Sequence, residues 1–336
     1  MSNALNVLHD ATDWFIPAEE NKPTLMYPGP VVAKGEAELK AQELREALLW
    51  RHSQDVDASK DWTQPMWGNS YRVHRQVTVD GVYFMARRIA KDVPRLSDLN
   101  LPTQIVTMLS SPLFAESGGL VLVTGSAGQG KSTTAAAILV ARAEKYGYFG
   151  LTVEDPPEFP MQKFYPSTLG RVGQIIQVPV ETGSFAEGLK EAMRCYPSNS
   201  KGSMLMVGEV RDPDAASQLL RAAMNGQFVL GTLHASDPIG ALERVISLAR
   251  HDMGESEAKS LLSHSLRAVL HQRIINKTLK MDVLISPNSH STVAAGIKGP
   301  SLSHLSSERE RQSKLLEKGG EALLDALFEK KLGGAR

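Results

Sequence analysis

A glycine-rich segment of eight residues constrains this chain more than any other part of it. Gly125-Ser126-Ala127-Gly128-Gln129-Gly130-Lys131-Ser132 fits the pattern G-x-x-x-x-G-K-[ST]. The apolar run at 120–124 before it predicts a buried strand, and the alanine-rich run at 133–146 after it predicts a helix. A strand, a glycine loop and a helix in this order predict a phosphate-binding loop in an α/β domain.

The chemistry of this loop favours a ligand that carries several phosphates. Glycines let the backbone turn tightly with its N–H groups inward, and the following helix adds the positive end of its dipole. We expect ATP as the ligand, with Lys131 at its β- and γ-phosphates and Ser132 at Mg²⁺. The predicted cofactor-binding set from this segment is Gly125, Ser126, Ala127, Gly128, Gln129, Gly130, Lys131, Ser132 and Thr133.

Length, charge and composition set the broad class. A chain of 336 residues with 42% hydrophobic content predicts two globular domains. Lys plus Arg and Asp plus Glu number 37 each, so we expect no direct binding of nucleic acid through net charge. One cysteine excludes an intramolecular disulfide and a four-cysteine zinc site. No secretory signal and no apolar stretch of spanning length are recognised, which predicts a cytoplasmic protein without a transmembrane segment.

The order of predicted elements separates an N-terminal part from an ATPase-like part. In the first, residues 34–51 predict a helix and residues 71–89 a β-hairpin that turns at Asp80-Gly81. In the second, strands and helices alternate, which predicts a sheet with helices on its faces. We therefore predict an N-terminal α+β domain at 1–95, a linker at 96–104, an α/β P-loop domain at 105–290 and a helical tail at 291–336.

Helix limits within the second part follow from capping residues and apolar spacing. Ser184 with Glu187 predicts a helix start, and Asp212 followed by Pro213 predicts another. Leucine and valine spacing predicts one amphipathic helix over residues 255–273. The Ser/Gly-rich stretch at 287–303 predicts a loose connection, and leucines after Ser306 predict one or two short helices.

Three further apolar runs each end in a polar cluster. Glu154, Glu209 and His234 stand at these ends, and the carboxyl ends of parallel strands are where α/β sheets bind ligands. Glu154 is a candidate for orienting or deprotonating the attacking water, or else a solvated acid at a strand end. Glu209 is the candidate second carboxylate for Mg²⁺. His234 is a candidate catalytic residue, although a lone histidine at a strand end is more often structural. The predicted catalytic set is Lys131, Glu154, Glu209 and His234.

These segments together resemble the type II/type IV secretion traffic ATPases, and most closely their type IV pilus motor branch. Residues 154–159 are similar to the acidic box of that family, residues 208–212 to its atypical Walker B motif, and residues 231–234 to its histidine box. The motifs occur in the family's order after the phosphate loop, and the resemblance covers residues 65 to 275.

The resemblance implies a PAS-like N-terminal domain, a RecA-like ATPase domain and assembly into a homo-oligomer, a hexameric ring. It further implies that Arg72 and Arg87 are brought to the phosphates, where an arginine stabilises transition-state charge. The alternative is that these two arginines lie on the hairpin face without that role. A partner protein of the pilus or secretion platform would hold the ring peripherally at the inner membrane.

Departures from the family pattern keep other functions open. Gln227 stands where the family often has a second histidine, and residues 195–202 lack the acidic run that usually precedes the Walker B motif in that family. The leading prediction is an ATPase that drives type IV pilus assembly or retraction, or related secretion. One alternative is a conjugative or type IV secretion traffic ATPase that moves protein or DNA. Another is a nucleotide-switched assembly scaffold with negligible hydrolysis.

Overall fold

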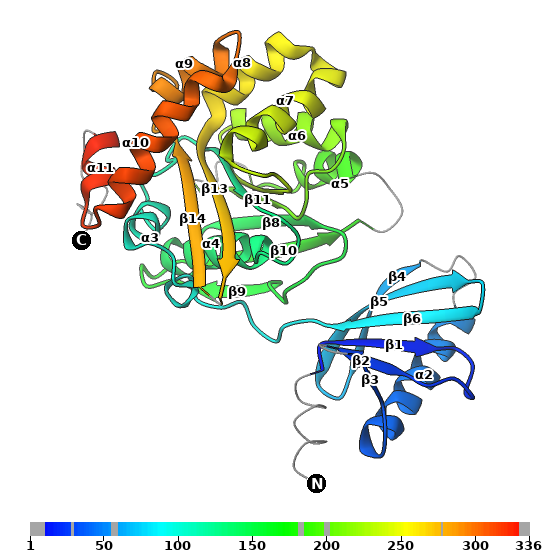
Figure 1. Ribbon diagram of the computed structural model, residues 1–336. Coiled ribbons are helices and arrows are strands. Elements are labelled where there is room, and N and C mark those ends of the chain that lie inside the picture. The colour runs from blue at the N-terminus through cyan, green and yellow to red at the C-terminus, as the bar shows by residue number, and fades with distance from the viewer. Residues whose placement is uncertain are drawn as a thin grey trace. The chain divides into compact units, whose positions relative to one another are not determined.

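The computed structural model describes residues 11–27, 30–54, 60–180, 185–197, 202–276 and 278–328. Two compact units make up the chain (Figure 1). The first is formed mainly by the chain up to Asp92, and the second by Val93–Pro157 together with the residues from Met161 on.

The N-terminal unit is an antiparallel sheet with one packed helix, which confirms the smaller α+β fold expected there. Its strands lie in the order β3-β2-β1-β6-β5-β4. Trp14 and Phe84 from the sheet and Leu44 from the helix are fully or almost fully buried in its core. The bounds are β1 Asp13–Pro17, β2 Leu25–Tyr27, β3 Val31–Val32, α2 Glu36–Gln54, β4 Asp61–Met66, β5 Asn69–Thr78 and β6 Gly81–Arg88.

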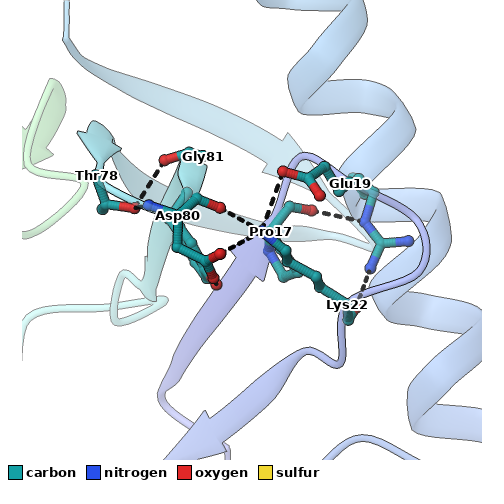
Figure 2. A network of polar contacts seen from close by, with 8 residues as sticks. Pro17, Glu19, Lys22, Thr78, Asp80 and Gly81 are labelled. Carbon is teal, nitrogen blue, oxygen red and sulfur yellow. Dashed lines mark hydrogen bonds and ion pairs between the residues drawn. The ribbon is translucent and has the colours of Figure 1, made fainter.

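The predicted hairpin is confirmed, and a lysine ties its turn to a neighbouring one. Strands β5 and β6 pair antiparallel with Thr78 opposite Gly81. Lys22 donates to the Asp80 carbonyl and lies 3.0 Å from the Asp80 carboxylate and 3.1 Å from that of Glu19 (Figure 2). The bond to Asp80 raises the pKa of Lys22, and the same contact lowers the pKa of Asp80. Two connections of the sheet are therefore fixed together.

The second unit is built on an eight-stranded sheet in the order β14-β13-β7-β12-β11-β8-β10-β9. From β13 to β10 each strand is parallel to the next, while β14 and β9 pair antiparallel at the two edges. The bounds are β7 Gly119–Thr124, β8 Phe149–Glu154, β9 Lys163–Pro166, β10 Val172–Pro179, β11 Met204–Val207, β12 Phe228–Leu233, β13 Leu266–Ile275 and β14 Thr278–Ile285. This mixed, mainly parallel sheet confirms the predicted α/β class.

Helices cover both faces of this sheet (Figure 1). Helices α5 to α8 share one apolar core with alternate residues of the strands, such as Leu120 and Leu122 on β7. Helix α4 contacts β7, β12, β11 and β10. The bounds are η1 Leu96–Leu99, α3 Thr103–Leu109, α4 Lys131–Tyr146, α5 Phe185–Ala192, α6 Pro213–Met224, α7 Pro238–Met253 and α8 Glu255–Ser265. Among the described residues, no helix has the length and apolar character needed to span a bilayer.

The single helix predicted over residues 255–273 is wrong. Helix α8 ends at Ser265, and the chain continues directly as strand β13, which pairs with β7 and β14. Most of β13 is buried, so both of its faces carry apolar side chains and the alternation typical of a half-exposed strand is missing. A short apolar run of this kind cannot be assigned to helix or strand from spacing alone.

The predicted cap at Asp212 is confirmed, whereas the predicted loose connection at 287–303 is not. The Asp212 carboxylate accepts from Ala215 N at 2.8 Å at the start of α6, and Pro213 is the first helical residue, as expected. Ser184, the other predicted cap, lies outside the described residues. The loose connection predicted at 287–303 is wrong, because it contains α9 Thr292–Lys298 and η2 Leu302–His304. Ser291 caps α9 by accepting from Ala294 N.

The C-terminal helices belong to the second unit and pack on its edge strand. The bounds are α10 Leu305–Glu317 and α11 Ala322–Leu327, so two helices are present where one or two short ones were expected. The buried Gln312 side chain of α10 accepts from Ile285 N at 2.7 Å and donates to Ile285 O at 3.0 Å. One side chain thereby completes the backbone hydrogen bonding of the last residue of β14.

Candidate functional site

The glycine loop joins the end of β7 to the start of α4 at the carboxyl edge of the sheet. Gly130 precedes α4 with φ 76°, and Gly125 has φ 149°. A Cβ on Gly125 would lie 2.4 Å from the carbonyl oxygen of Gln272, so no larger residue fits there. Within the part of the chain that the structure describes, no side chain caps the start of α4, and backbone N–H groups at such a helix start can bind an anion.

The loop lysine is nearly buried and faces the polar end of a neighbouring strand. Lys131 is 8% exposed, and its Nζ donates to Ser126 O at 2.9 Å. The same Nζ lies 3.4 Å from Nδ1 of His234, which follows β12. Nε2 of His234 lies 3.2 Å from Oε1 of Glu209, which follows β11. The structure therefore brings three of the predicted catalytic residues into one continuous chain of contacts.

Positive neighbours keep the Glu209 carboxylate ionised. Burial by itself raises the pKa of Glu209, but the Arg211 hydrogen bond, at 2.6 Å, and the charges of Arg211, His234 and Lys131 outweigh it. The net pKa lies below the usual glutamate range. A carboxylate that is ionised at neutral pH and only partly buried is a suitable ligand for a hard divalent cation.

Glu154 lies on the next strand, β8, and is deeply buried. It is 2% exposed and accepts from Thr152 Oγ1 at 2.6 Å and from Gln177 Nε2 at 3.1 Å. Gly208, just before Glu209, packs against it, because a Cβ on Gly208 would lie 3.2 Å from Glu154 Cγ. Of the two alternatives for this acid, the solvated one is excluded. Its catalytic role stays a prediction.

The remaining predicted residues fall into two groups. Ser132 and Thr133 lie in the first turn of α4 and are partly exposed, as are Gln129 and Gly130, while Ser126, Ala127 and Gly128 are exposed. Arg72 and Arg87 lie opposite each other on β5 and β6 of the N-terminal unit. Nε of Arg87 lies 2.5 Å from the Asp13 carboxylate. The predicted arrival of these arginines at the phosphates stays a prediction.

Strand β13 supplies contacts to the loop that the sequence interpretation missed. Nε2 of Gln272 donates to Gln129 O, and Nδ1 of His271 lies 3.1 Å from Thr124 Oγ1 at the end of β7. Both residues fall within the helix predicted over residues 255–273. The available signal was the pair of apolar runs on either side of Asn276, which has φ 51° and is typical of a hairpin turn.

Comparison with known proteins agrees with this geometry. The family model described as type II/IV secretion system protein matches residues 88–304. A twitching motility protein of Neisseria gonorrhoeae is 35% identical over 206 residues, which are 61% of this chain and 50% of that protein. The type IV pilus retractation ATPase PilT of Pseudomonas aeruginosa is 38% identical over 160 residues, 47% and 43% of the two chains. The chain thus spans about half the length of these curated relatives.

Type II secretion proteins and solved structures extend the comparison. The type II secretion system protein E of Klebsiella pneumoniae is 36% identical over 166 residues, 49% of this chain and 29% of that protein. The crystal structure of the pilus retraction motor PilT with bound ADP has a TM-score of 0.72 at 24% identity and covers 98% of this chain and 96% of its own. The ATPase DotB of Legionella pneumophila has a TM-score of 0.64 at 20% identity, with 98% and 91% covered.

The two structures share the fold, and the family model spans the phosphate loop, both strand-end acids, the histidine and strand β13. The chain therefore belongs to the type II/IV secretion system protein family.

Proposed function

We propose that the protein is an ATPase that couples ATP hydrolysis to movement in a pilus or secretion machine. The observation that carries this proposal is the chain of contacts from Lys131 through His234 to Glu209, beside an uncapped helix start. A lysine, an ionised carboxylate and the backbone N–H groups of a helix start are what phosphoryl transfer from a nucleotide needs at one place.

Each residue in the chain has a distinct proposed task. Lys131 exchanges its bond to Ser126 O for the β- and γ-phosphates. His234 holds Lys131 and Glu209 at a fixed separation, since it contacts both with its two ring nitrogens. Glu154, buried beside Gly208, orients or deprotonates the attacking water.

The donor set fits Mg²⁺ as the accompanying ion. No group of three or more His, Cys, Asp or Glu able to hold a metal occurs among the described residues. A site for Mg²⁺ does not need one, because this ion takes one or two protein oxygens and completes its shell with phosphates and water. Ser132 and the ionised Glu209 would supply these oxygens, and the ion would neutralise charge on the transferred phosphoryl group.

The assembly and the machine it serves are proposed from the relatives. One matched protein is named for twitching motility, one for pilus retraction and one for type II secretion. We propose a hexameric ring in which Arg72 and Arg87 complete the phosphate site when domains close. A pilus or secretion platform protein would hold this ring at the inner membrane. The type II secretion relative keeps transport of another substrate as the second candidate, and neighbouring pilin genes would favour the pilus role.

Calorimetry and phosphate release on the full chain test the proposal. We expect Mg²⁺–ATP to bind and inorganic phosphate to be released, with release lost in EDTA and strongly reduced in Ser132→Ala. Absence of binding to the folded protein would refute the proposal. Binding without release, also after addition of membranes that contain the platform protein, would instead support the nucleotide-switched scaffold. Light scattering with and without ATP measures whether the ring has six subunits.

A further inference from the structure

We propose that Gln272 on β13 is a positioning residue that sets the shape of the phosphate loop and thereby the affinity for nucleotide. This inference rests on the proposed function, because it deepens the account of the same site. It concerns a residue that lies 143 positions beyond the loop residue it holds.

Three contacts tie the loop to one stretch of β13. The Gln272 side chain donates from Nε2 to Gln129 O at 2.5 Å. Ile274 N donates to the Gln129 side-chain oxygen, also at 2.5 Å. The Gln272 carbonyl oxygen packs against Gly125, where a Cβ would come within 2.4 Å. The first glycine, the backbone and a side chain of the loop are thus all held from one strand.

The bond to the Gln129 carbonyl determines where the next N–H group points. In a trans peptide the C=O and N–H bonds of one plane point in opposite directions. Because Gln129 O is held on the β13 side, the N–H of Gly130 points away from β13. That N–H group immediately precedes α4, where backbone donors would bind the phosphates of the proposed ligand. Gln272 therefore fixes one donor of the phosphate cradle without touching the ligand.

An unpaired oxygen indicates that Gln272 is kept for this donated bond. The residue is 1% exposed, and among the described residues its Oε1 has no hydrogen-bond partner. A buried acceptor without a partner is destabilising, and a methionine of similar size would avoid this cost. Packing alone does not explain a glutamine at this position, whereas orientation of the loop does.

The test is the affinity for Mg²⁺–ADP of Gln272→Met, measured by calorimetry together with thermal melting. Gln312→Met is the matched control. Gln312 is likewise a buried glutamine whose side chain bonds main-chain atoms, but its partner is Ile285 on β14 and not a residue of the phosphate loop. Ile285 pairs with Ala268, and Ala268 pairs with Val121, which lies three residues before Thr124 at the loop end of β7.

We expect Gln272→Met to raise the Kd for Mg²⁺–ADP about tenfold, a change of about 1.4 kcal/mol, with a melting temperature equal to or above that of the wild type. Gln312→Met should lower the melting temperature and leave the Kd within about twofold. An unchanged Kd in folded Gln272→Met, or an equal rise in both variants, would overturn the inference.

Gln129→Ala supplies an independent measurement if Gln272→Met does not fold. This substitution removes the hydrogen bond that the Gln129 side chain accepts from Ile274 N, and Gln129 is partly exposed. A rise in the Kd for Mg²⁺–ADP supports the inference, and an unchanged Kd contradicts it. The wild type separates the two levels of the proposal. If the wild type binds no nucleotide, the proposed function fails, whereas normal binding by the variants refutes only the role of Gln272.

Discussion

Two nearly buried cations on helix α4 differ in what surrounds them. Lys131, at the first residue, is 8% exposed and contacts a loop carbonyl and the His234 ring. Arg142, three turns later, is 3% exposed and donates to Leu109 O at 2.8 Å and Ser111 O at 3.0 Å. Its guanidinium also lies 4.5 Å from the centre of the Phe228 ring.

The partners of Arg142 belong to the fold itself. For Lys131 we propose instead that the partner is a ligand. Arg142 donates to two backbone carbonyls at and just after the end of α3, and it thereby joins α3 to α4. Burial lowers the pKa of Arg142, but arginine stays protonated in proteins. Lys131 instead contacts the Ser126 carbonyl of the phosphate loop and the His234 ring, which in turn contacts the ionised Glu209 carboxylate. Contacts of this kind are readily exchanged for phosphate oxygens.

The largest expected effect is on Lys131→Ala. We expect phosphate release to fall at least about a thousandfold, because the cation proposed to stabilise the transferred phosphoryl group is lost. The free energy of unfolding should change by less than about 1 kcal/mol, since the partners of Lys131 at its charged end are partly exposed. Steady-state release and urea unfolding measure the two quantities. A large loss of stability would show that Lys131 serves the fold as Arg142 does.

Glu209→Gln tests the carboxylate at the same end of the helix. We expect hydrolysis to fall about a hundredfold or more while the Kd for ATP stays within about threefold, because the amide keeps the shape but loses the charge. Single-turnover phosphate release and calorimetry separate these two effects. Hydrolysis at the wild-type rate would remove Glu209 from the proposed mechanism.

Arg142→Met tests the cation near the C-terminal end of α4. The two carbonyls that Arg142 now satisfies would be left without this donor, so we expect the free energy of unfolding to fall by about 3 kcal/mol. The Kd for Mg²⁺–ADP should stay within about twofold. If nucleotide affinity falls as much as stability, the two ends of α4 are coupled and the comparison fails.

The smallest expected effect is on the pH dependence of stability, through His271. This residue contacts Thr124 at the end of β7, just before the phosphate loop. Burial lowers its pKa below the usual histidine range of about 6.5, so the unfolded state takes up a proton first as the pH falls. Stability should therefore decrease as the pH falls from 7 to 5.5, and less so in His271→Gln. Melting temperatures at the two pH values measure this, and equal pH dependence would contradict it. Charged groups around the ring are Arg273, Asp282, Asp237 and Arg309.

The sequence predicts a feature correctly where the residues that form it are close together in the chain. The loop, its glycines and Lys131 lie within eight residues, and each needs a particular residue type for a local reason. The strand-end positions of Glu209 and His234 were also predictable, because parallel strands gather their carboxyl ends at one edge. Their contact with Lys131 follows from the order β7-β12-β11, which the sequence indicates only through the family resemblance.

Prediction from the sequence fails where burial removes the pattern. Strand β13 is mostly buried on both faces, so its sequence shows no alternation of apolar and polar residues. The predicted helix therefore extends past Ser265, where α8 ends, into the strand. The helix prediction therefore gives no sign that Gln272 lies beside Gln129, to which it is hydrogen-bonded. Likewise, nothing in the sequence near Glu154 shows that its carboxylate is buried between Thr152 and Gln177.

The sequence by itself determined which chemical groups this protein holds ready for a nucleotide, because a phosphate cradle is encoded by neighbouring residues. Only the tertiary structure decided how those groups are held, through strand β13 behind the loop and Arg142 at the far end of α4. The physical reason is that these contacts join residues far apart in the chain, and their geometry exists only once the sheet has formed.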